Sequence, residues 1–163
     1  MGRRVTIFLM AALLASGIGA ATARAARAPW YPLFQAINHV RAQHNLRPVE
    51  ASPRLHWAAR HHSADMLVRD YFGHTSPSGS TLYDRIVNSG FLTDGTWWAG
   101  ETLAWGTGTS GDPAVVVDMW LKSPEHRAIL LSPLWRFVGI GRARGTFLGH
   151  SGANIWTADW GHR

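Results

Sequence analysis

Three segments far apart in the sequence each carry a side chain suited to acid–base or metal chemistry. His74 lies in a stretch rich in turn-forming residues (71–79), Glu101 lies among tryptophans and glycines, and His126 lies in a short helical segment. Imidazole titrates near neutrality and is a common zinc ligand, and a carboxylate can bind a divalent cation or orient a histidine. These residue types allow a divalent-metal site, for example for zinc, or a metal-free general base with its orienting partner.

Each of these residues also has a structural interpretation. His74 can tie its loop by hydrogen bonds, His126 can cap its helix, and Glu101 can be a buried partner for a backbone amide or for His74, since a buried charge is costly unless paired. Of the neighbours His61 and His62 on one helix, we expect one ring to point inward and the other into solvent. The sequence contains neither a His-Glu-x-x-His helix motif nor a nucleophile elbow, which disfavours a conventional zinc protease or serine hydrolase.

Helices are expected to position most of these side chains. Apolar residues recur at helical spacing over 31–44, and Ser52-Pro53 supplies a cap and a first-turn proline for a second helix that ends near Asp70. Shorter helices are predicted over 81–90, 112–123 and 125–131.

Strands are predicted over 97–105, 137–141 and 154–160. A turn region over 145–152 joins the last two and favours an antiparallel pair. Trp97, Trp98 and Trp105 can belong to the core or line a ligand groove. Helices that come first and strands that close the chain indicate an α+β architecture.

The N-terminus has the pattern of a secretory signal peptide. Arg3 and Arg4 precede an apolar stretch over 5–14, and small residues follow up to Ala25. The apolar stretch is shorter than the roughly 20 residues that span a bilayer. We therefore expect residues 1–25 to be removed, leaving an exported mature protein over 26–163 that is secreted or periplasmic and has no stable membrane anchor.

Composition limits what the mature chain can be. It keeps thirteen basic and ten acidic residues, a mild excess without the basic stripe of a nucleic-acid-binding protein. Its length suits one domain, which we expect to be monomeric. There is no cysteine, so disulfides cannot hold the fold, and nine tryptophans supply the core with aromatic bulk.

Short motifs in a fixed order resemble the bacterial branch of the CAP superfamily, which includes cysteine-rich secretory proteins, antigen 5 and pathogenesis-related proteins and whose domain is also called SCP. The motifs are Phe72-Gly73-His74-Thr75-Ser76-Pro77, Gly100-Glu101-Thr102-Leu103-Ala104, Met119-Trp120-Leu121-Lys122-Ser123-Pro124-Glu125-His126-Arg127, Phe137-Val138-Gly139-Ile140-Gly141 and Trp156-Thr157-Ala158-Asp159-Trp160-Gly161. The resemblance covers residues 34–161.

The resemblance implies an α-β-α sandwich in which a small antiparallel sheet lies between helices, with a central cleft lined by two histidines and two acids. His74, Glu101 and His126 match three of these four positions and are the candidate metal ligands and the candidate catalytic residues. The second acid of the family falls on Ser123, and Glu125 is the nearest acid.

The resemblance leaves two main functions open. One is a binding module for a lipid-like or cell-envelope ligand, with a possible divalent metal such as zinc in the cleft. The other is a metal-assisted hydrolase, such as a peptidase, that acts outside the cytoplasm. A purely structural envelope protein is a third interpretation. Because Ser123 replaces the second acid, the sequence favours binding.

Overall fold

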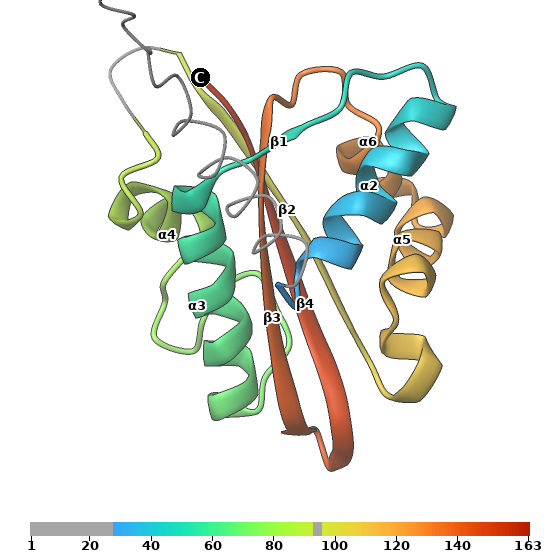
Figure 1. The fold of residues 1–163 in the computed structure, drawn as a ribbon. Coiled ribbons are helices and arrows are strands. Elements are labelled where there is room, and N and C mark those ends of the chain that lie inside the picture. Colours follow the sequence, from blue (N-terminus) through green and yellow to red (C-terminus); the bar gives the residue numbers. More distant parts are fainter. Residues whose placement is uncertain (1–27, 93–95) are drawn as a thin grey trace, which may run out of the picture.

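The computed structural model describes residues 28–92 and 96–163 and has three layers. A twisted sheet separates α3 (Pro53–Arg69) and α4 (Leu82–Asn88) on one face from α2 (Tyr31–Gln43), α5 (Pro113–Lys122) and α6 (Pro124–Leu130) on the other (Figure 1). The predicted α-β-α sandwich is confirmed. The predicted signal peptide lies outside the described residues. Within them, no helix has the length and apolar character needed to cross a bilayer.

The helices near the candidate site begin and end where the sequence indicates. The Ser52 side chain accepts a hydrogen bond from the Leu55 amide at the start of α3, and Asp70 ends that helix in the left-handed conformation. Thr81 and Asp84 form a reciprocal capping box at the start of α4. These caps set where the loop between α3 and α4 leaves and rejoins helical structure.

The sheet has the order β1-β3-β4-β2. The long strands β2 (Trp98–Gly106), β3 (Phe137–Phe147) and β4 (His150–His162) pair in antiparallel fashion, as predicted, and the two-residue strand β1 (Glu50–Ala51) pairs in parallel with β3. The sheet is therefore mixed at one edge.

The turn lies inside the predicted region 145–152 but is shorter than expected, because both strands run through most of that region. Only Leu148 and Gly149 form the turn, both with positive φ, as a two-residue hairpin requires. Gly145, which suggested a turn, instead lies in β3 at a place where a side chain would press on Leu67.

Tryptophans fill the core between the sheet and the helices α2 and α5. Trp120, Trp156 and Trp160 are almost completely buried. Their indole nitrogens donate hydrogen bonds to the Leu103 carbonyl, the Gly111 carbonyl and the Thr102 hydroxyl respectively. Each large ring therefore buries its apolar area without leaving its polar atom unpaired.

Two glycines let α3 lie directly on β3. A methyl group added at Gly139 would overlap the backbone of Leu55 and His56, and one at Gly141 would overlap the backbone of Ala59 and Arg60. Backbone cannot yield as a flexible side chain can. The distance between α3 and the sheet therefore depends on the absence of side chains at these two positions.

We expect Gly139→Ala to destabilise the domain by about 3 kcal/mol or to prevent folding, since overpacking against rigid backbone lies at the costly end of such substitutions. Gly73→Ala is the matched control, because its added carbon meets nothing closer than 3.9 Å; it should change the free energy of unfolding by less than about 1 kcal/mol. Urea unfolding measures both variants. Equal stability of the two would show that α3 can move away from β3.

Candidate functional site

The centre of the site is the carboxylate of Glu101, whose side chain is only 1% exposed. Glu101 lies on β2 and points toward α3 and α4. Its Oε1 accepts a hydrogen bond of 2.6 Å from His74 Nδ1, and its Oε2 accepts one of 2.7 Å from the Arg85 guanidinium. The glutamate therefore joins a strand, a loop and a helix that are far apart in sequence.

Arg85 holds the loop as well as the carboxylate. From the first turns of α4 its guanidinium donates to the carbonyls of His74 at 3.0 Å and Ser80 at 3.3 Å, in addition to Glu101. The side chain is 8% exposed, and the three bonds are charge-assisted; the one to Glu101 is buried and the two to carbonyls are partly buried. Arg85 thus fixes the backbone on which His74 stands.

His62 lies behind this cluster, buried on α3. Its Nε2 donates to the Gly73 carbonyl at 3.0 Å and lies 3.8 Å from Oε2 of Glu101. The Tyr71 hydroxyl lies 3.4 Å from His62 Nδ1 and donates to the Asp65 carboxylate at 2.7 Å. This second tier of polar groups anchors the other end of the loop.

The partners of Glu101 set the charges in the cluster. Burial acts to raise the pKa of Glu101, but the His74 hydrogen bond and the charge of Arg85 outweigh it and hold that pKa below its usual value. The hydrogen bond to Glu101 raises the pKa of His74, against the opposing effect of burial. Burial lowers the pKa of His62, which favours its neutral form.

Asp159 is a second buried acid beside Glu101, to which it lies opposite in the β2–β4 register. It is fully buried, and among the described residues neither carboxyl oxygen has a hydrogen-bond partner. Burial, followed by the negative charge of Glu101, raises the pKa of Asp159 well above its ordinary value. A raised pKa favours the protonated form of Asp159, in which the pair carries one negative charge.

His126 is partly buried on α6. Burial lowers the pKa of His126, and the positive charge of His74 lowers it further. The charge of Glu125 acts to raise the pKa of both His74 and His126. The two histidines and Glu125 thus lie within electrostatic reach of one another, while Ser123, at the predicted second-acid position, is the N-cap residue of α6.

The donor atoms can be tested against a divalent metal. Both oxygens of Glu101 already accept hydrogen bonds, and within residues 28–92 and 96–163 no group of three or more His, Cys, Asp or Glu side chains is arranged to hold a metal ion. A metal bound through His74 and His126 stays a prediction, and such a metal would need water in its other positions. Direct ligation by Glu101 stays a prediction.

Sequence reasoning found part of this cluster. It expected contact between Glu101 and His74 as one alternative, and an inward and a solvated ring at His61-His62; the structure buries His62 and exposes His61. It did not single out Asp159, because a lone acid in an apolar strand gives no sign of its neighbour across the sheet. The strand register alone reveals that pair.

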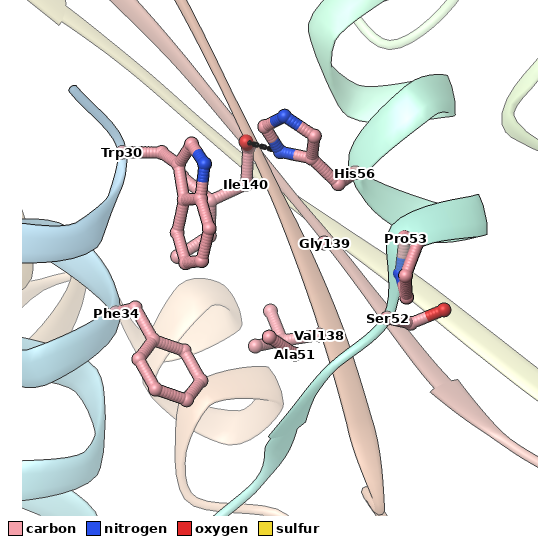
Figure 2. Close-up of a pocket in the computed structure, with 9 residues that line it drawn as sticks. All are labelled: Trp30, Phe34, Ala51, Ser52, Pro53, His56, Val138, Gly139 and Ile140. Atoms are coloured by element: carbon pink, nitrogen blue, oxygen red, sulfur yellow. Dashed lines mark hydrogen bonds between the residues drawn. The ribbon is translucent and has the colours of Figure 1, made fainter. Parts of the chain in front are cut away.

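A separate apolar pocket of about 180 Å³ lies near the other edge of the sheet (Figure 2). Trp30 and Phe34 from the start of α2 face Val138 and Ile140 of β3 across it, and His56 of α3 donates a hydrogen bond from Nδ1 to the Ile140 carbonyl at 2.5 Å. The remaining lining residues are Ala51, Ser52, Pro53 and Gly139.

A basic pocket adjoins the apolar one and shares Trp30 and His56 with it. Its volume is about 320 Å³, and Arg60 and Arg142 line it without an acidic residue. Burial lowers the pKa of Arg142, and the neighbouring Arg144 adds to the effect. The two pockets together offer an apolar surface that leads to two cations.

Comparison with known proteins agrees with this architecture. The model of the cysteine-rich secretory protein (CAP) family matches residues 34–160, so the chain belongs to this family. The uncharacterised protein YkwD of Bacillus subtilis is 31% identical over 125 residues, which are 77% of this chain and 44% of that protein. The chain thus spans less than half the length of this curated relative.

Solved structures share the fold. An extracellular protein of Bacillus anthracis that contains an SCP domain superposes with a TM-score of 0.67 at 27% identity, covering 82% of this chain and 40% of that one. An outer surface protein of Borrelia burgdorferi gives a TM-score of 0.63 at 25% identity, covering 80% of this chain and 90% of that one.

We expect Asp159→Asn to stabilise the domain increasingly as the pH rises. An acid whose pKa is raised on folding opposes folding above its unfolded pKa, where the unfolded chain ionises and the folded chain does not. Asparagine has nearly the same side-chain shape but does not ionise, so it removes this pH-dependent cost of folding. The gain in free energy of unfolding should therefore be small near pH 3.8, the ordinary aspartate pKa, and grow toward about pH 7.

Urea unfolding across this pH range measures the effect, with Asp118→Asn on the exposed face of α5 as the control. A stability difference for Asp159→Asn that does not change with pH would mean that Asp159 ionises in the folded protein.

Proposed function

We propose that this CAP domain works outside the cytoplasm as a binding module for a lipid-like ligand with an acyl chain and an acidic head group. The observation that carries the proposal is the apolar pocket with a basic pocket beside it. The predicted signal peptide and the extracellular or outer-surface character of similar proteins support export.

The apolar pocket suits a hydrocarbon chain. Trp30, Phe34, Val138 and Ile140 present carbon surface, and the polar ring atom of His56 that faces this wall is already bound to a carbonyl. A hydrocarbon chain in this pocket is removed from water without depriving a polar atom of the pocket wall of its hydrogen bond. Each buried methylene contributes about 0.8 kcal/mol.

The basic pocket suits a carboxylate or phosphate head group. Arg142 is held in place by two hydrogen bonds to Asn154 Oδ1, of 3.1 and 2.7 Å, and lies over the Trp156 ring. Arg60 stands on α3 one turn after His56. A fixed guanidinium can receive an anion with little loss of side-chain entropy.

A chain-length series tests this function on the mature protein. Calorimetric affinity for fatty acids should rise about fourfold per methylene until the pocket is filled, and the matching alcohols should bind more weakly. Ala51→Phe places a ring at the pocket wall and should weaken binding at least about tenfold.

Ala42→Phe, on the exposed face of α2 outside the lining, is the control and should bind as the unaltered protein does. Affinity that is independent of chain length, or that is equal for Ala51→Phe and Ala42→Phe, would refute the lipid-binding function.

A divalent metal at His74 and His126 is a second candidate function. The observation that favours it is the Glu101–His74 hydrogen bond, which fixes His74 through Nδ1 and leaves Nε2 as the ring nitrogen for a ligand, as carboxylates do for metal-binding histidines. A bound zinc would supply a Lewis acid. The metal-assisted hydrolase depends on the same histidines.

Zinc titration by calorimetry of the metal-stripped mature protein tests the metal site. We expect one equivalent to bind and the binding to be lost in both His74→Ala and His126→Ala. The control is His39→Ala, on the exposed face of α2. Binding that survives both cluster substitutions, or no binding at all, would eliminate the metal site and with it the hydrolase.

A further inference from the structure

A polar pocket of about 250 Å³ lies between α3 and α4 and takes no part in the functions proposed above. Trp57, His61 and Asp65 line it from α3, and Ser78 and Asn88 line it from the connecting loop and α4. This volume is slightly below the roughly 300 Å³ at which pockets begin to hold drug-sized ligands. It therefore suits a single ring.

One wall of the pocket is an aromatic surface held in a fixed orientation. Trp57 is 46% exposed, and His61, one turn later on α3, lies against it with ring centroids 4.0 Å apart and ring planes tilted by 36°. His61 Nδ1 donates to the Trp57 carbonyl at 2.7 Å, which fixes the histidine beneath the indole. The exposed indole surface is flat and apolar, and it stands next to polar groups.

The other walls offer both donors and acceptors. The Ser78 hydroxyl and the Asn88 amide can each donate and accept, and both residues are exposed. Asp65 accepts from Tyr71 and pairs with Arg69 at 2.8 Å. Burial acts to raise the pKa of Asp65, but the hydrogen bonds from Tyr71 and Ser76 and the charge of Arg69 together outweigh it and lower that pKa, so this group is a carboxylate that accepts.

The charges in the pocket exclude an anion. Arg85 is the cation in the lining; its two terminal nitrogens are already bound to Glu101 and to two carbonyls, and its Nε is buried away from solvent. A phosphate or carboxylate would therefore meet the negative charge of Asp65 without a free cation to pair with. A neutral ligand whose hydroxyls donate to Asp65 and exchange hydrogen bonds with serine and asparagine fits this lining.

A pyranose ring has this combination of properties: an apolar C–H face and a rim of hydroxyls that donate and accept. We propose that the polar pocket binds one pyranose unit of a neutral glycan, with the ring against Trp57 and its hydroxyls bonded to Asp65, Ser78 and Asn88. Trp57, Ser78 and Asn88 are all exposed, so the rest of the glycan can extend from the pocket into solvent.

Titration of the ¹⁵N-labelled mature protein with cellotetraose and chitotetraose tests the proposal. The Trp57 indole signal and the amides of the polar pocket should shift together with saturation at millimolar concentration or below. Trp57→Ala should weaken the binding at least about tenfold, and Trp57→Phe, which keeps an aromatic face, should restore part of it.

Trp98→Ala is the matched control, because Trp98 is 53% exposed on β2 and does not line the pocket; it should bind as the unaltered protein does. Thermal unfolding checks that each variant is folded. Three results would overturn the proposal: no shift with either oligosaccharide, shifts that persist in Trp57→Ala, or binding of an acidic heparin tetrasaccharide at the same signals in preference to the neutral ones.

Ala51→Phe, which blocks the apolar pocket, should leave glycan binding unchanged, so the result is independent of lipid binding.

Discussion

The negative charge of Glu101 is the constraint on which this half of the molecule depends. A carboxylate that is removed from water costs several kcal/mol unless cations and donors surround it, and its partners here come from three different segments. His74 brings the loop, Arg85 brings α4, and His62 brings α3. Because each partner must stay to keep the charge compensated, the glutamate determines where the loop between α3 and α4 lies.

The same charge decides the state of its neighbour. Asp159 stands opposite Glu101 in the sheet, and two carboxylates cannot both ionise there. Glu101 has Arg85 and His74 as partners, whereas neither carboxyl oxygen of Asp159 has a hydrogen-bond partner among the described residues, so the charge is favoured on Glu101 and the pKa of Asp159 is raised.

Local signals predicted the elements well and the site only in part. Ser52, Thr81 and the prolines after Ser123 and Asp112 mark helix starts that depend on a few adjacent residues, so short-range pattern suffices for them. The antiparallel hairpin is confirmed, but its turn is shorter than expected, because Gly145 lies in β3 against Leu67 and not in the turn. The Glu101–Asp159 pair depends on strand register, which no local pattern contains.

The position of α3 connects the two binding regions. Because Gly139 and Gly141 have no side chains, the buried face of α3 lies directly against β3. The α3 residues on either side of that face are left to line pockets. His56 and Arg60 extend from one flank over the apolar and basic pockets, and Trp57 and His61 extend from the other over the polar pocket. Each pair is one helical turn apart, so one rigid helix presents two chemically different surfaces. The polar pocket also shares His62 and Arg85 with the Glu101 cluster, whereas the apolar pocket shares no residue with it, so only a ligand in the polar pocket lies against the groups that hold the loop between α3 and α4.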